Sequence, residues 1–182
     1  MPNLREEGGM GLIEVLIAMM VLMVAILALV AAYSSGYVAL NRATRVSSAT
    51  LLADSQMERF RALQFDNIAL NTGCGASCNE DSTYTGDAAY SSTAEITGCA
   101  TTDRSCLPTQ TLTGPDGASY RLDTFVDCET LSGGTFTLAT AGACSPGVST
   151  SAVKLVTVVV RKSGGTSDWV REQSTFNGLT GK

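Results

Sequence analysis

An uninterrupted apolar run near the N-terminus constrains this chain more than any other feature. Residues 10–32 read MGLIEVLIAMMVLMVAILALVAA, and Glu14 is the only charged residue among them. At a rise of about 1.5 Å per residue, a helix of this length spans the hydrocarbon core of a bilayer, which is about 30 Å thick. The sequence therefore predicts a single membrane-spanning helix over 10–32.

A cleaved secretory signal peptide is the alternative interpretation of the same run. Such a signal has a basic leader, a shorter apolar stretch and a small-residue cleavage site after that stretch. The first nine residues, MPNLREEGG, carry Arg5 but also Glu6 and Glu7, and Ala31-Ala32 resembles a cleavage site. The length of the apolar run and the acidic leader favour a membrane anchor.

Glu14 is the most informative residue of the apolar run. A carboxylate deep in a membrane costs about 2 to 3 kcal/mol, and less near the interface. An opposite charge from a partner relieves this cost in a low-dielectric environment. We therefore expect Glu14 to pair with a cation. A position at the lipid headgroup boundary is the alternative.

The residues around Glu14 resemble a known motif. Residues 8–18 read GGMGLIEVLIA and are similar to the prepilin motif of type IV pilins and type II secretion pseudopilins. In that motif a glycine precedes the cleavage point, and a glutamate is the fifth mature residue. The resemblance implies that a prepilin peptidase cleaves after Gly9 on the cytoplasmic side and methylates the amine of Met10. It also implies that Glu14 pairs with the N-terminal amine of a neighbouring subunit during assembly.

The chain departs from the major pilins in three respects. Met10 stands where they usually carry Phe, and the leader is acidic where theirs is basic. The proline that kinks many pilin helices is absent, with Ala31 in its place. These departures favour an unkinked helix and a minor pilin or pseudopilin. Residues 51–63, LLADSQMERFRAL, resemble the second half-helix of PilV-type minor pilins and I-type pseudopilins.

Helical periodicity continues beyond the apolar run. Apolar residues recur every three or four positions from Tyr33 to Leu63, with polar and charged residues between them. One helix is therefore expected from Gly11 to about Phe65. The sheet is expected to cover this helix from Leu40 to Leu63, and the helix face from Tyr33 to Leu63 is expected to pack on both its own sheet and neighbouring helices.

Strand signals are concentrated in the C-terminal half of the chain. Residues 152–161, AVKLVTVVVR, are the strongest because of their β-branched run, and 168–176 follow as a hairpin partner after a glycine-containing turn. Residues 120–128 and 135–138 are weaker candidates. Burying the helix stripe and the sheet face together predicts an α+β fold with an antiparallel sheet on the long helix.

The resemblance implies a type IV pilin-like layout for the whole chain. Residues 1–9 are the leader peptide, and 10–32 are the transmembrane and assembly helix. Residues 33–66 are the amphipathic half of the helix. Residues 67–182 form an extracytoplasmic, disulfide-bonded, β-rich domain.

The six cysteines all lie C-terminal to the apolar run: Cys74, Cys78, Cys99, Cys106, Cys128 and Cys144. An even count on one side of a membrane segment predicts disulfides in an oxidising compartment, and the sequence does not choose among the pairings. Residues 71–118 have few large apolar side chains, so we expect loops that disulfides stabilise in place of a core. A four-thiolate zinc site is the alternative, which the CxxxC and Cx6C spacings disfavour.

Composition disfavours several other functions. The chain has no histidine, which excludes Ser-His-Asp and Cys-His sites within it. Its net charge of −5 disfavours nucleic acid, although Arg161, Lys162 and Arg171 could form a local basic patch. The acidic stretch 79–81, NED, lacks the rest of a calcium loop. We therefore expect no metal, no cofactor and no enzymatic activity.

The function implied by the resemblance is that of a structural and assembly subunit. Such a minor pilin enters the inner membrane as a single-pass precursor, is processed, and joins a type IV pilus at the cell surface. Its partners are other pilins, contacted through N-terminal helices, the prepilin peptidase, the inner-membrane assembly platform and membrane lipid before assembly. Two alternatives remain open: a type II secretion pseudopilin in the periplasm, and a pilus-tip module for adhesion or DNA uptake. Motility is a further role of such pili.

Overall fold

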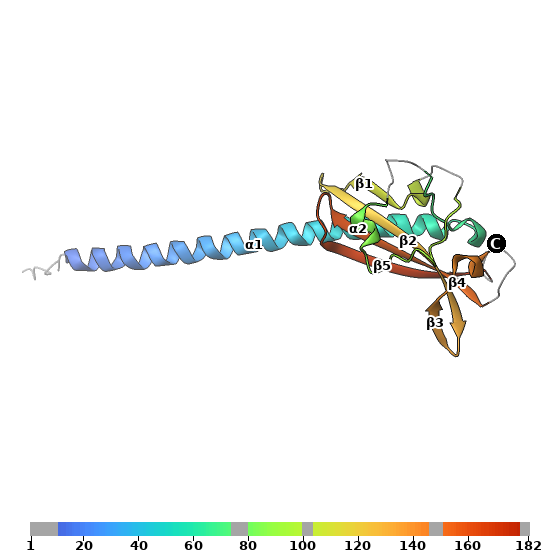
Figure 1. Cartoon of the computed structure of the whole chain (residues 1–182). Coiled ribbons are helices and arrows are strands. Elements are labelled where there is room, and N and C mark those ends of the chain that lie inside the picture. Colours follow the sequence, from blue (N-terminus) through green and yellow to red (C-terminus); the bar gives the residue numbers. More distant parts are fainter. Residues whose placement is uncertain (1–10, 74–79, 100–103, 146–150, 179–182) are drawn as a thin grey trace, which may run out of the picture. The chain divides into compact units, whose positions relative to one another are not determined.

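The computed structural model of the chain describes four stretches of sequence: residues 11–73, 80–99, 104–145 and 151–178 (Figure 1). The elements follow in the order α1 (Leu12–Arg61), η1 (Phe65–Asn67), α2 (Ser82–Thr85), η3 (Arg104–Cys106), β1 (Thr109–Thr113), β2 (Ser119–Ser132), β3 (Thr135–Leu138), η4 (Ala141–Cys144), β4 (Ala152–Lys162) and β5 (Asp168–Asn177). Contacts between residues divide the chain into two units, Met1–Ala43 and Thr44–Lys182. Helix α1 contributes to both units.

The first unit contains the apolar part of α1. Every described residue from 11 to 43 is exposed, including the large apolar side chains from Leu12 to Val30. Within the described residues, α1 is the one helix that is long and apolar enough to cross a membrane. The expected membrane-length helix is therefore present. Helix α1 begins at Leu12, one residue after the start at Gly11 that was predicted for the long helix.

The second unit begins with the amphipathic part of α1. Ala49, Ala53, Met57 and Phe60 recur at helical spacing, are fully buried, and belong to one core cluster with the inner face of the sheet. Their spacing places them on one side of the helix, which is why a single sheet face covers them. The predicted α+β architecture, a long N-terminal helix packed on an antiparallel sheet, is confirmed.

The extent of the helix and of its cover differs from the prediction. Tyr33, Tyr37 and Leu40 are exposed, and burial on this stripe begins at the half-buried Val46. The helix also ends at Arg61, short of the predicted Phe65. After the helix, Gln64 is extended, with φ −68° and ψ 148°, and the short turn η1 follows it.

The sheet is antiparallel throughout, with strand order β1-β2-β4-β5. Strand β3 pairs with the C-terminal end of β2, on the same edge as β1. Alternate residues of β2 and β4 contribute buried side chains to the helix-facing core, including Leu122, Val126, Val156 and Val158. All four predicted strands are present, and β1 is an additional strand that the sequence did not reveal.

The opposite face of the sheet carries a second, smaller core. Tyr84 of α2 stacks on Phe125 of β2 at a centroid separation of 4.4 Å, and both pack with Val159 of β4. Tyr84 and Ala94 are fully buried, and Ile96 is buried in the core that faces α1. The expectation that 71–118 lacks a core is therefore wrong for this part, because a few apolar residues from it pack on the sheet.

Two disulfides join the described cysteines. Cys99 is bonded to Cys106 and Cys128 to Cys144. Cys74 and Cys78 lie outside the described residues. The predicted use of cysteines as disulfides is confirmed for the four that are described, and it excludes these four thiolates from a zinc site.

Candidate functional site

The residues expected to direct processing and assembly lie at the start of α1. Gly9 and Met10 fall outside the described residues. Glu14 lies in the first turn of α1, where its amide donates to the carbonyl of Gly11 at 2.8 Å. The first turn of a helix leaves amide groups without intrahelical partners, so a carboxylate is favourable there. Its exposed side chain is available to a partner.

The surface around Glu14 is apolar on all sides of the helix. Ile13, Leu16 and Ile17 are its neighbours in the first two turns, and each is more than half exposed. An exposed apolar surface of this extent is typical of a helix that contacts a membrane or another protein. The arrangement has one chemical capacity, which is to present a single negative charge within an apolar contact surface.

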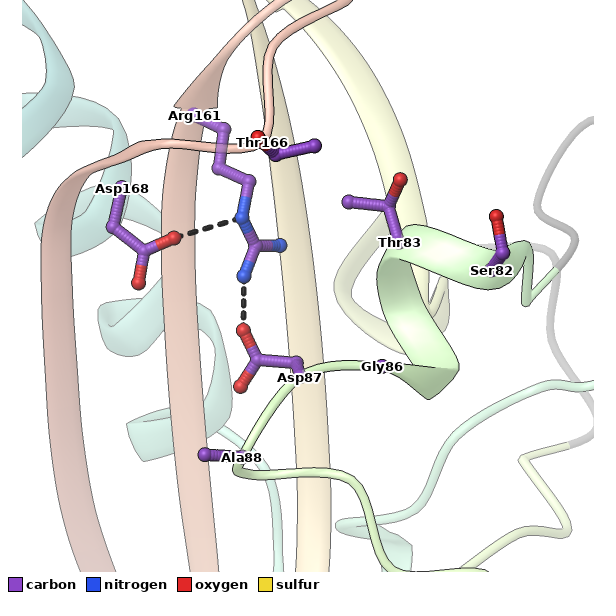
Figure 2. Close-up of a pocket in the computed structure, with 8 residues that line it drawn as sticks. All are labelled: Ser82, Thr83, Gly86, Asp87, Ala88, Arg161, Thr166 and Asp168. Carbon is purple, nitrogen blue, oxygen red and sulfur yellow. Dashed lines mark hydrogen bonds and ion pairs between the residues drawn. The ribbon is translucent and has the colours of Figure 1, made fainter.

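A second group of functional side chains lies on the face of the sheet opposite α1. Arg161 of β4 is only 3% exposed and forms ion pairs with Asp87, Asp123 and Asp168. Figure 2 shows Arg161 between Asp87 from the segment after α2 and Asp168 at the start of β5. These residues border an open cleft of about 400 Å³, whose other lining residues are Ser82, Thr83, Gly86, Ala88 and Thr166.

The carboxylates of this group are matched to arginines. Burial alone would raise the pKa of Asp87, but hydrogen bonds from Arg171 and from the amide of Ala89 outweigh burial and leave that pKa below its ordinary value. Hydrogen bonds from Arg121 hold the pKa of Asp81 far below its usual range. Because the charges compensate one another, the group acts as a clamp between the 80–99 segment and the sheet.

Asp81 also determines how that segment begins. Its side chain accepts hydrogen bonds from the amides of Thr83 and Tyr84, each at 3.0 Å, and so caps the N-terminus of α2. Arg121 of β2 donates to the same carboxylate, with Nη2 at 2.7 Å from Oδ1. The cap and the ion pair together fix α2, and with it Tyr84, on the sheet.

The basic patch suggested by the sequence does not form as an open surface. Arg161 is buried among carboxylates, and Arg171 pairs with Asp87 and Asp168. Strand alternation and β-hairpin geometry gave no sign of these partners, because Asp87 is 74 residues from Arg161 in the sequence. Of the three residues, Lys162 alone is exposed without an acidic partner among the described residues.

No metal-binding cluster accompanies these groups in the described part of the chain. There, no three histidine, cysteine, aspartate or glutamate side chains are placed to share a metal ion. The four described cysteines are consumed in disulfides. The guanidinium of Arg161 is engaged by three carboxylates, those of Asp87, Asp123 and Asp168.

The end of the β2–β3 hairpin is the other distinctive surface. It projects past the end of β4, which pairs β2 only as far as Thr130 (Figure 1). Gly133 and Gly134 form its two-residue turn, and both have positive φ, which this turn requires. The hairpin exposes apolar side chains of both strands: Leu131 and Phe136 beyond the end of β4, and Leu138 beside it.

Comparisons with known proteins identified no relative of this chain. No protein-family model matches the chain, and searches of curated proteins and of solved structures gave no significant similarity. The fold, a long apolar N-terminal helix continuing onto an antiparallel sheet with disulfides, is compatible with a pilin-like protein.

Proposed function

We propose that this chain is a minor pilin, a structural and assembly subunit of a type IV pilus that prepilin peptidase processes. The observation that carries the proposal is the dual character of α1. Its first part is apolar and exposed with Glu14 in the first turn, and its last part is the buried spine of a disulfide-bonded domain. A subunit that is held in a membrane and then packed by its helix in a filament needs both parts.

The apolar part of α1 explains both states of such a subunit. Before assembly, lipid covers the exposed side chains from Leu12 to Val30. After assembly, the same side chains pack against the helices of neighbouring subunits. Glu14 then has an unfavourable place among apolar groups unless a cation reaches it, and the amine of a processed neighbour supplies one. Pairing at Glu14 would thus fix how far one helix slides along the next.

The proposal is tested by replacing Glu14 with alanine and following processing and filament incorporation separately. Glu14→Ala is expected to leave cleavage intact and to remove the protein from sheared surface filaments. Glu58→Ala is the matched control, because Glu58 is an exposed carboxylate of the same helix outside the apolar part. Incorporation of Glu14→Ala at the level of Glu58→Ala would refute the proposed role of Glu14.

A pseudopilin of a type II secretion system is the alternative with the same N-terminal chemistry. The two are separated by deleting the gene and measuring surface pili and secreted enzymes in parallel. Loss of pili with normal secretion supports the minor pilin. Loss of secretion with normal pili supports the pseudopilin.

The projecting hairpin favours a second candidate, a binding role at the pilus tip. Isolated two-stranded ribbons are marginally stable, and exposed apolar groups on one mark a contact surface. Replacing Phe136 and Leu138 with serine is expected to reduce adhesion while filaments form normally. Unchanged adhesion in the double variant would exclude this surface from adhesion.

A further inference from the structure

A short segment, residues 94–96, pairs with the part of β2 that lies between its pairings with β1 and β3. Strands β1 and β3 pair with the two ends of β2 and leave residues 124–128 between them. The amide of Ile96 donates to the carbonyl of Val126 at 2.7 Å. The amide of Cys128 donates to the carbonyl of Ala94 at 2.9 Å. Residues 94–96 therefore act as a one-rung strand that fills the gap.

The rung places two carboxylic acids opposite each other. Glu95 and Asp127 are antiparallel bridge partners, so their side chains leave the same face of the sheet close together. Asp127 is 3% exposed, and its Oδ1 is buried with no hydrogen-bond partner among the described residues. The Oε1 of Glu95 accepts from the hydroxyl of Tyr84 at 2.9 Å. A buried carboxylate oxygen without a hydrogen-bond partner, beside a second carboxylate, favours the protonated form of the acid.

The groups that surround Asp127 give no cation to offset its charge. Burial, with repulsion from Glu95 and Glu129, raises the pKa of Asp127 to about 7. Burial also raises the pKa of Glu95, and Glu80 adds to that effect. On β4, the residue paired with Asp127 is the apolar Leu155.

The cations nearby are engaged elsewhere. Lys154 adjoins Leu155 but points to the other face of the sheet, where its ammonium donates to the carbonyls of Phe65 and Ile68. Arg121 and Arg161 bind Asp123, an outer-face carboxylate of β2 that is four residues from Asp127. Among the described residues, the rung is therefore surrounded by carboxylic acids and by the phenols of Tyr84 and Tyr90, with no cation to compensate its charge.

We propose that the Glu95–Asp127 rung is a pH-sensitive clasp, which holds segment 94–96 on β2 while Asp127 carries a proton and loosens when that proton leaves. Opening of the clasp also affects the packing of Tyr84. Glu95 binds Tyr84, and Tyr84 covers Phe125 by stacking, so loosening weakens the cover over the second core. The proposal concerns the folded domain and is independent of whether the chain assembles into a filament.

The direction of the pH dependence follows from the two states of Asp127. In the open state its carboxyl faces water and has an ordinary pKa of about 3.9. In the closed state the pKa is about 7. Opening therefore releases a proton between these values, so the opening constant rises about tenfold for each pH unit from about pH 4 to 7 and levels off above.

The test is amide hydrogen exchange of the full-length chain in detergent micelles between pH 5 and 8, corrected for the intrinsic exchange rate at each pH. Protection of the Ile96 and Cys128 amides is expected to fall about tenfold per pH unit up to about 7. The amides of the β4–β5 ladder serve as the internal reference and are expected to keep their protection. A fall of the same size in that ladder would overturn the proposal, because it would report unfolding of the whole domain.

Two variants and one direct titration complete the test. Asp127→Asn keeps the shape of the side chain and is expected to abolish the pH dependence, whereas Glu129→Gln, the control on the same strand, is expected to retain it. A slope that survives Asp127→Asn overturns the proposal. Carbon-13 NMR of the unsubstituted chain gives an answer that does not depend on variant folding. Titration of the Asp127 carboxyl near pH 7 supports the clasp, and titration near pH 4 contradicts it.

Discussion

Replacing Arg161 with methionine tests the ion-pair clamp most sharply. The substitution removes the guanidinium from Asp87 and Asp123, whose side chains are 3% and 0% exposed. Breaking a buried pair by removing one partner costs about 3 to 5 kcal/mol, since a buried charge is left uncompensated. Arg171 still reaches Asp87, and Arg121 still reaches Asp123, so we expect the lower end of this range, about 3 kcal/mol.

Arg171→Met is the matched control for this substitution. Arg171 contacts two of the same carboxylates, Asp87 and Asp168, but its side chain is 33% exposed. Ion pairs that water reaches contribute about 0 to 1 kcal/mol, so the control should cost at most about 1 kcal/mol. The contrast between the two arginines therefore isolates burial as the source of the effect.

Urea unfolding of the full-length chain in detergent measures both variants. Trp169 is the only tryptophan, packs against the main core from β5, and reports unfolding by fluorescence. With a urea slope of about 1.5 kcal/mol per molar, a loss of about 3 kcal/mol lowers the midpoint by about 2 M. Equal midpoints for Arg161→Met and Arg171→Met would refute the argument that burial gives the Arg161 pairs their strength.

Two further substitutions test other parts of the domain by the same assay. Lys154→Met removes the ammonium that donates to the carbonyls of Phe65 and Ile68 at 2.7 and 2.8 Å, and we expect a loss of about 1 to 3 kcal/mol; a midpoint at or above that of the unsubstituted chain would contradict this role. Replacing Cys128 and Cys144 together with serine opens a disulfide with a sequence separation of 16 and should cost about 3 kcal/mol. If that pair contributes nothing, the midpoint will not move.

The features that the sequence predicted well are those set by local pattern. The apolar run and its helical continuation predicted α1, because side-chain periodicity determines which face a helix buries. The β-branched run at 152–161 predicted β4, and the glycine turn after it predicted β5 as its partner. Two predictions were wrong in extent: the sheet does not cover the helix as far as Leu40, and the helix ends before Phe65. Periodicity shows where a helix is amphipathic, but the length of the sheet decides how much of it is covered.

The features that the sequence did not reveal depend on distant pairs. Arg161 looks like an exposed strand residue until Asp87 and Asp123 are placed beside it. Tyr84 looks like a loop residue, and only its stacking on Phe125, 41 positions later in the sequence, shows that it is a core residue. Strand β1 was missed for the same reason, since its threonine-rich sequence becomes a strand by pairing with β2.

The candidate assembly site was predicted from sequence alone, and the structure adds its surroundings. Glu14 lies in the first helical turn among exposed apolar side chains, and its pairing in a filament stays a prediction. Gly9 and Met10 lie outside the described residues, so their roles remain predictions. The Glu95–Asp127 rung could not be predicted from the sequence, because the two acids are 32 residues apart and only the fold makes them bridge partners.

The N-terminal mass of the protein from cells with and without prepilin peptidase is the most direct test of the minor pilin proposal. We expect a mature chain that begins with N-methylated Met10 in the presence of the peptidase, and an uncleaved chain in its absence. A chain that begins at Met1 in both strains, or one cut after Ala32, would contradict the proposal.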